Sequence, residues 1–309
     1  MNKKNIKTAA EESDLKSDIE GFLIDISIQE SIKKFIEQVD KRYKNEGGSG
    51  NGIKTGLGKL TLKEGELNIL TSKSDFLTNA FELSLIYHIS IQGKEKSGLF
   101  IPGNYNNVEI VTRLVSMISE ISVGKISSGF LKKEEIKKIE NACNELYKAP
   151  INIFNEPNIS IEKLESIITH YVQAYHIKIA FIEGFKFIEE LVDSKEKDYR
   201  DNLYLILDTF KRLSEKLNIT IIVGMVLSKK ENEENNCFPT INDFKKYLII
   251  PNMADRIFFI HIDSYMFGQD TQKATLNVTE RLGIKSPYYD LKFITNIGLF
   301  INDETVSTN

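Results

Sequence analysis

The sequence predicts an α/β fold in which helices flank a largely parallel central sheet. Short apolar runs typical of strands alternate along the chain with longer amphipathic segments typical of helices. Two of the runs, Ile177–Ile182 and Asn218–Leu227, are apolar enough to be strands buried on both faces, as parallel strands usually are. With 309 residues, of which 41% are hydrophobic and 27% charged, the chain can bury a substantial core.

Three segments precede this alternating region. Residues 1–14 are polar and are expected to form a disordered tail, and residues 47–52 are a Gly-rich flexible linker. Residues 15–46 lie between them and are predicted to hold a helix that spans about 15–43. The apolar side chains on one face of this helix have to pack on the protein's own core or on a neighbouring subunit: Ile28, Ile32, Phe35, Ile36 and Val39.

The alternating region is predicted to be one domain over residues 53–300, followed by a tail at 301–309. Each expected strand is a short apolar run: Leu67–Leu70, Gly98–Ile101, Ile151–Phe154, Ile177–Ile182, Asn218–Leu227, Arg256–Ile262, Ala274–Thr279 and Tyr289–Ile294. Each expected helix has apolar residues at helical spacing: Asn79–Ile91, Val108–Ser119, Lys132–Leu146, Ile161–Tyr175 and Tyr199–Leu217.

Composition and charge exclude several classes of protein. A net charge of −4 gives no overall attraction to nucleic acid, so any such surface has to be a local basic patch. Cys143 and Cys237 fit neither a disulfide framework nor a metal-ligand spacing. The N-terminus does not resemble a signal peptide, and no stretch reaches the roughly 18 apolar residues of a membrane span. We therefore expect a cytoplasmic protein with no membrane partner.

One segment has the context of a phosphate-binding loop without its residues. Between Leu67 and Phe81 the sequence predicts a strand, a polar turn and the start of a helix, where Gly-Lys-Ser/Thr would bind a phosphate. The matching positions are Leu77, Thr78 and Asn79. Lys73, within the turn, is either a group that could neutralise a phosphate or an ordinary exposed lysine.

The order of the motifs over about residues 52–295 resembles the C-terminal motor domain of the DnaB-type replicative DNA helicases. This resemblance implies a RecA-like core of the P-loop NTPase type, preceded by a linker helix that docks on a neighbouring copy. The matching stretches are Gly52–Leu57 with Leu60, Gly65–Leu67, Lys125-Ile126 with Gly129, Ala149–Ile151 with Asn155, Ile182–Phe187, Phe210–Asn218, Asn242–Phe244 and Ala254-Asp255.

The departures from the family's pattern fall on the chemistry of ATP hydrolysis, which the resemblance implies would use ATP and Mg²⁺. The family's catalytic glutamate falls near Pro102-Gly103, with no acid in register. Glu183 stands for the metal-site aspartate and is either a cation ligand or a polar strand end. Arg281 retains the arginine of the family's finger, or makes a surface contact.

Two functional hypotheses follow. The first is a catalytically degenerate helicase relative with a structural, regulatory or binding role in DNA replication, which is not an ATPase. The second is a divergent but active ATP-dependent DNA helicase that uses Lys73, Glu183 and Arg281. Losing several catalytic positions at once favours the first. The expected partners are copies of the chain through the helix at 15–43, single-stranded DNA, for which Lys245 and Lys246 are candidates, and a replicative helicase.

Overall fold

The structure, a computed structural model, describes most of the chain. The described residues are 52–93, 98–103, 105–156, 159–184, 199–227, 238–244, 249–262, 269–281 and 285–303, with Ile28, Ile32, Lys33 and Ile36 of the N-terminal segment. Residues 1–51 and 52–309 form two separate compact units. The four described residues of the first unit are helical and exposed, and most of the helix predicted at 15–43 lies outside the described residues.

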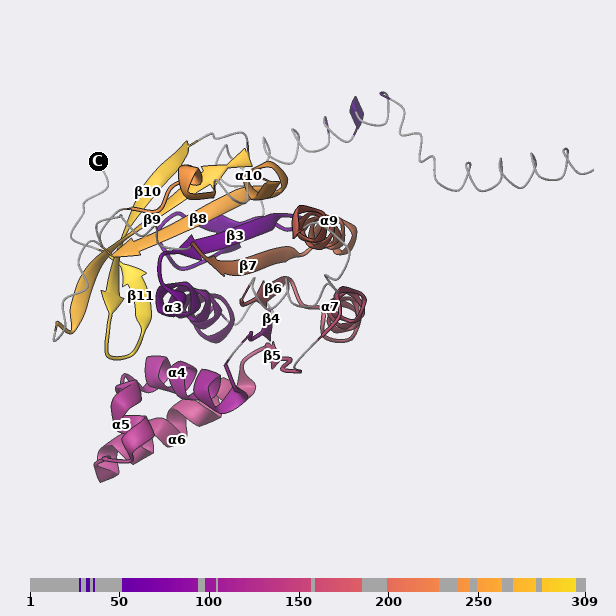
Figure 1. Ribbon diagram of the computed structural model, residues 1–309. Coiled ribbons are helices and arrows are strands. Elements are labelled where there is room, and N and C mark those ends of the chain that lie inside the picture. Colours follow the sequence, from indigo (N-terminus) through magenta and orange to yellow (C-terminus); the bar gives the residue numbers. More distant parts are fainter. Residues whose placement is uncertain are drawn as a thin grey trace, which may run out of the picture. The chain divides into compact units, whose positions relative to one another are not determined.

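The second unit contains a nine-stranded sheet with the order β11-β10-β9-β8-β3-β7-β6-β4-β5 (Figure 1). The six strands from β8 to β5 are parallel, and β9, β10 and β11 add an antiparallel edge. The strands are β3 (Leu67–Ser72), β4 (Gly98–Ile101), β5 (Ile151–Ile153), β6 (Ile179–Ile182), β7 (Thr220–Val226), β8 (Arg256–Ile262), β9 (Thr271–Glu280), β10 (Lys285–Ile294) and β11 (Leu299–Asn302). The predicted α/β fold with a largely parallel central sheet is confirmed.

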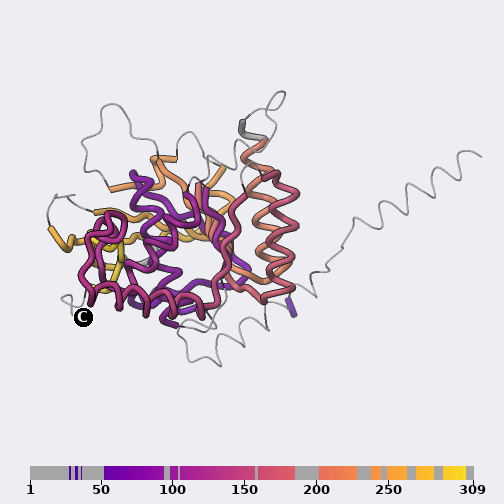
Figure 2. The backbone as a smooth tube through the Cα atoms, turned by 90° about the horizontal axis from the view of Figure 1, so that it is seen from below, coloured from indigo at the N-terminus to yellow at the C-terminus, as the bar shows by residue number. Residues whose placement is uncertain are grey.

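Helices cover both faces of the sheet, with α3 and α4 on one side and α7 and α9 on the other (Figure 1). Figure 2 shows α7 and α9 running side by side. The helices are α3 (Asp75–Ile86), which continues as a π-helix η1 (Tyr87–Gln92), α4 (Asn107–Ser119), α5 (Val123–Ser128), α6 (Lys133–Lys148), α7 (Ile161–Tyr175), α9 (Tyr199–Leu217), the 3-10 turn η2 (Ile241–Phe244) and α10 (Ile249–Met253).

The period-two alternation of the parallel strands divides their side chains between two apolar clusters. Leu70 of β3 and Phe181 of β6 pack with α3 and α4, whereas Ile69 and Ile182, one residue away, pack with α7 and α9. All four side chains are fully buried. Because both faces are covered, these strands have to be apolar on both faces, and this explains why they read as continuous apolar runs.

Charged groups at the start of the central strands fix β3 against β8. The Leu67 amide donates to Asp255 Oδ2 at 2.8 Å, and Lys211 donates to the same oxygen at 2.6 Å. Arg256, which is 5% exposed, donates through Nε to Glu66 Oε2 at 2.7 Å and through Nη1 to the Thr61 carbonyl at 2.8 Å. Glu66, Leu67, Lys211 and Asp255 come from three of the matching sequence stretches, and their role here is structural.

The outer edge of β11 contacts α3 and its π-helical continuation η1. The Phe300 amide donates to Ser84 Oγ at 2.9 Å, and the Phe300 carbonyl lies 2.7 Å from His88 Nε2. A sheet edge with unpaired backbone groups invites pairing with another chain, and at Phe300 both backbone groups already have partners on α3 and η1.

Several element boundaries differ from the prediction. The first helix begins at Asp75 and not at Asn79, four residues earlier, because Asp75 to Thr78 continue the helix and leave only Lys73 and Ser74 as a turn. Strand β11 runs to Asn302, past the expected domain end at 300, because it pairs with β10. Short elements were not predicted: the hairpin of β1 (Ile53–Lys54) and β2 (Thr61–Leu62), α5, η2, α10 and β11.

None of the helices in the described part of the chain is both long and apolar enough to cross a membrane.

The buried pair of Arg256 and Glu66 yields the first prediction. Replacing Glu66 by Gln leaves the Arg256 charge buried without its carboxylate, so we expect the free energy of unfolding in urea to fall by about 3 kcal/mol. The matched control is Asp208→Asn, which breaks an exposed pair with Arg212 on α9 and should cost under about 1 kcal/mol. Equal losses in the two variants would contradict a special role for the Arg256 pair.

Candidate functional site

The candidate site lies at the carboxyl end of β3, where the chain turns directly into α3. Only Lys73 and Ser74 separate the last residue of the strand from the first residue of the helix. The turn is closed by its own side chains, because Ser72 Oγ accepts from the Ser74 amide at 3.0 Å and donates to the Ser74 carbonyl at 2.6 Å. Ser74 is extended and α3 begins without a side-chain cap.

The three positions that match a phosphate loop are all part of α3. Leu77 packs against the core cluster on this face of the sheet. Thr78 is 3% exposed and its hydroxyl lies 3.0 Å from Ser72 Oγ. Asn79 is fully buried. These three residues lie in the first turns of the helix, and it is the helix boundary that differs from the prediction, since α3 begins at Asp75.

Asn79 connects a strand end to a neighbouring helix. Its Nδ2 donates to Glu183 Oε1 at 2.5 Å, and its Oδ1 accepts a hydrogen bond from Arg113 Nη1. Glu183 follows β6 and is 7% exposed. The guanidinium of Arg113 also lies 4.7 Å from the centre of the Tyr105 ring and 5.7 Å from that of Phe76. A chain of polar contacts thus runs from α4 through α3 to the end of β6.

A second buried carboxyl group lies beside Glu183. Glu82 of α3 is fully buried, and among the described residues neither of its oxygens has a hydrogen-bond partner, nor does Glu183 Oε2. Glu82 lies against Gly224 of β7, where a Cβ would come within 2.5 Å of Glu82 Oε1. Glu183 and Gly224 directly follow the registered pair Ile182–Val223, so the two carboxyl groups meet above neighbouring strands.

Burial determines the protonation of both carboxyl groups. Desolvation raises the pKa of Glu183 to about 7, although the hydrogen bond from Asn79 and the charge of Arg113 lower it, and Asp75 raises it further. Desolvation, and then the charge of Glu183, raise the pKa of Glu82 well above its ordinary value. Glu82 is therefore held toward its neutral form, and Glu183 is about half protonated at neutral pH.

No side chain fits at Gly103, which follows β4 near the position that matches the family's catalytic glutamate. A Cβ on Gly103 would lie 2.8 Å from the Glu183 carbonyl oxygen, which is closer than real side chains approach a backbone atom. The Glu183 amide donates to the Ile101 carbonyl at 3.0 Å and holds the two strand ends together. Gly103 is thus required by the close approach of β4 and β6.

The sequence-predicted residues do not all meet. Glu183, Thr78 and Asn79 come together, whereas Arg281 is exposed and its amide donates to the Asp255 carbonyl beside the start of β8. The carboxyl end of β6 and the start of β8 are opposite edges of the sheet, so Arg281 is remote from Glu183 of the same chain. Lys73 lies in the turn. Lys245 and Lys246 lie outside the described residues.

Sequence reasoning missed Arg113 and Glu82. Both have a detectable signal, because each is a charged residue on an apolar helical face. Arg113 follows Ile110 by three residues and precedes Met117 by four, and both of these side chains are buried. Glu82 interrupts the apolar run from Ala80 to Ile86. A charge in such a position has to find a partner or lose its charge.

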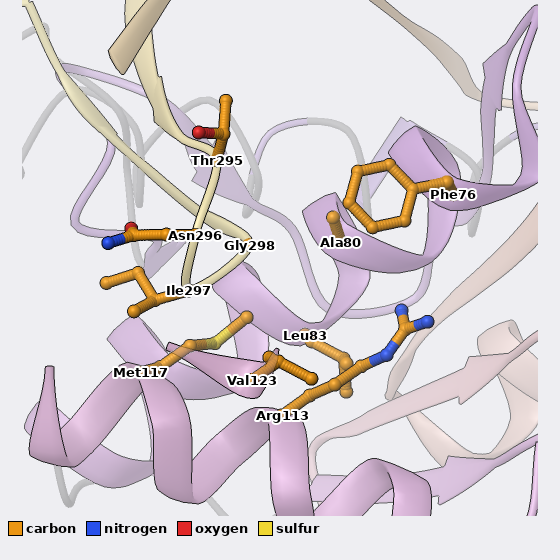
Figure 3. A pocket seen from close by; sticks show the side chains of 10 residues that line it. All are labelled: Phe76, Ala80, Leu83, Arg113, Met117, Val123, Thr295, Asn296, Ile297 and Gly298. Atoms are coloured by element: carbon orange, nitrogen blue, oxygen red, sulfur yellow. The ribbon is translucent and has the colours of Figure 1, made fainter. Parts of the chain in front are cut away.

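A small cavity adjoins Arg113 between α3, α4 and the turn after β10 (Figure 3). Its volume is about 110 Å³, and the guanidinium of Arg113 points toward Phe76 and away from the cavity's apolar wall. Pockets for cofactors and drug-sized ligands typically measure roughly 300–1,000 Å³. The cavity is too small for a nucleotide.

Comparison with known proteins places this fold in a family. The profile of the family described as the DnaB-like helicase C terminal domain matches residues 52–302. The replicative DNA helicase DnaB of Treponema pallidum is 23% identical over 237 residues, covering 75% of this chain and 52% of that protein. The DnaB of Rickettsia typhi is 24% identical over 249 residues. The chain spans about half the length of these curated relatives.

Solved structures agree on the fold. A DnaB-like replicative helicase, solved with attention to its interactions with primase, superposes with a TM-score of 0.74 and 17% identity, covering 96% of this chain and 77% of that one. An ATPase domain is covered completely, together with 91% of this chain, with a TM-score of 0.77 and 19% identity. The predicted RecA-like core and the resemblance to DnaB-type helicases are confirmed, and the chain belongs to the DnaB-like helicase C-terminal domain family.

Proposed function

We propose that this chain is a relative of the DnaB-type replicative helicases that does not hydrolyse ATP and that has a structural or regulatory role in DNA replication. The observation that carries the proposal is the two-residue connection between β3 and α3. A phosphate loop needs several residues between strand and helix so that their amides can surround the phosphate. Here Leu77, Thr78 and Asn79 are turned into the helix, so the residues present do not fit ATP.

Charge supports the same conclusion. The start of a helix attracts a phosphate through its unpaired amides and its dipole. In α3 the first residue, Asp75, supplies a negative charge of its own at that place. This charge opposes the binding of a triphosphate at the start of α3.

The metal position supports it as well. In P-loop NTPases, Mg²⁺ is held by the Ser/Thr of the loop and by an acid on a neighbouring strand. The matching pair here is Asn79 and Glu183, and the two side chains are hydrogen-bonded to each other. The amide N–H thus uses Glu183 Oε1, an oxygen that a metal ion would need as a ligand. Gly103, near the position that matches the family's catalytic glutamate, has no space for any side chain.

The proposal includes partners in place of a reaction. They are other copies of the chain through the helix at 15–43, single-stranded DNA with Lys245 and Lys246 as candidate contacts, and a replicative helicase. A cytoplasmic location belongs to the same proposal. The alternative, a divergent ATP-driven helicase, is tested by the first of the experiments below.

ATP binding separates the two functions. With Mg²⁺ present, we expect calorimetry to detect no binding of ATP at millimolar concentration to the wild type, because the site lacks both loop and metal position. Binding in the micromolar range that is lost in Lys73→Ala and kept in Lys133→Ala would contradict the proposal. It would support the active motor, since Lys133 lies on α6, remote from the turn.

The protonation of Glu183 predicts a pH dependence. The pKa of Glu183 is about 7 in the folded protein and near 4.5 when exposed, so the unfolded state releases its proton first as the pH rises. The contribution of Glu183 to stability is therefore complete below pH 4.5 and is lost between pH 4.5 and 7, by about 3 kcal/mol. Glu183→Gln cannot lose a proton, so its stability relative to the wild type should rise between pH 4.5 and 7 and stay level above pH 7.

The measurement is urea unfolding of both proteins from pH 4.5 to 8. The difference between them isolates Glu183 from the other titrating groups. A difference that stays constant over this range would refute the raised pKa. Glu140→Gln, which changes an exposed glutamate on α6, is the matched control for the substitution itself.

Self-association through the N-terminal helix is tested on its apolar face. Ile28, Ile32 and Ile36 are 68%, 48% and 53% exposed, which is unusual for a row of isoleucines on one helix face. We expect Ile32→Asp to lower the mass of the full chain in sedimentation experiments. Lys33→Ala, on the next residue, should leave it unchanged. A monomeric wild type, or equal effects of both variants, would count against this contact.

A further inference from the structure

We propose that Arg113 acts as an internal ligand: through Asn79 it holds Glu183 and thereby fixes α4, the start of α3 and the end of β6 in one arrangement that needs no bound nucleotide. Arg113 is thus a positioning residue. This inference rests on the proposed function, because it explains how the contact between Asn79 and Glu183 is kept in a protein that does not bind ATP.

The Asn79 side chain is placed to transmit this effect. Its amide donates from Nδ2 to Glu183 and accepts at Oδ1 from Arg113, so both polar atoms of the side chain are hydrogen-bonded. Asn79 is fully buried, and a buried amide that loses a partner pays the full cost of its desolvation. The three side chains therefore depend on one another.

Aromatic rings fix the orientation of the guanidinium. Tyr105 precedes α4 and Phe76 belongs to α3, and the two ring centres lie 4.7 and 5.7 Å from the Arg113 guanidinium carbon. A planar guanidinium stacks on aromatic faces and donates hydrogen bonds in its own plane at the same time. Lysine can supply the charge but neither the plane nor the fixed fork of donors.

Backbone contacts extend the closure to the neighbouring strand. The Glu183 amide donates to the Ile101 carbonyl, and Gly103 approaches the Glu183 carbonyl so closely that no side chain fits between them. Arg113 therefore reaches, through Asn79 and Glu183, the same segment that leads from β4 into its own helix. The contacts form a closed circuit through α4, α3, β6 and the end of β4.

Hydrogen exchange measures whether this circuit holds α4 in place. In Arg113→Met, which keeps the apolar stem and removes all the donors, we expect amide exchange across residues 107–119 to rise by about tenfold, the scale of one charged hydrogen bond. Arg113→Lys should exchange almost as fast, because the fork is lost. Arg212→Met, which removes an exposed pair on α9, should leave this region at the wild-type rate.

A double-mutant cycle tests the route through Asn79. If Arg113 acts through the amide, adding Arg113→Met to Asn79→Ala should change the exchange of α4 by less than about twofold, and the two effects should not multiply. Multiplying effects would overturn the route. Wild-type exchange of α4 in Arg113→Met would overturn the inference as a whole.

A third comparison separates this inference from the proposed function. Adding ATP and Mg²⁺ to the wild type should leave the exchange of α4 unchanged. Protection by ATP would overturn the proposed function, whereas the variants without ATP decide the inference. If Asn79→Ala does not fold, Asn79→Ser takes its place, because serine keeps a polar group and is too short to bridge Arg113 and Glu183.

Discussion

The hydrogen bonds that Asp255 and Glu66 make at the start of β3 determine where the central strand lies, and much of the domain follows from that. Asp255 receives the first amide of β3, and Glu66 pairs with Arg256 at the first residue of β8. Because β3 is held in register between β7 and β8, the position of its carboxyl end is fixed, and α3 begins two residues beyond that end. Charged residues at the edge thus determine the position of an apolar core.

The residues shared with the helicase family serve the fold more than the chemistry. Glu66 and Asp255 belong to matching sequence stretches, and both hold strands together. At the opposite edge of the sheet, where family members of this type handle nucleotide, the side chains of Asn79 and Glu183 bind each other. The architecture is therefore kept at 23–24% sequence identity to the curated relatives. The function of the site has to be argued from the site itself.

The sequence predicted the fold well because its signal is local. A buried parallel strand is apolar along its whole length, so β6 and β7 were recognisable without their neighbours. The start of α3 was predicted four residues too late, since Asp75 and Phe76 have no helical pattern of their own and enter the helix only because the turn is short. Very short strands such as β1 and β11 have too few residues to show an apolar alternation, although each pairs with a neighbouring strand in a local hairpin.

The candidate site was predictable in part. Asn79 and Glu183 were both identified as site positions from the resemblance to the helicase family, and in the structure they are hydrogen-bonded to each other. That Arg113 completes the contacts depends on how α4 packs, which spacing along the chain does not specify. The burial of Glu82 depends on Gly224, more than 140 residues away, and is a property of the folded protein alone.

The early start of α3 determines what a phosphate loop at this place would require. One helical turn now occupies the stretch in which a phosphate loop would have to form, and the turn is backed by packed side chains such as Leu77. No single substitution converts that turn into a loop, and a lysine introduced at Thr78 alone would enter a buried, already bonded position. Forming a phosphate loop here would therefore require several substitutions together, because unwinding the turn also removes the packing of Leu77 and the hydrogen bond of Thr78.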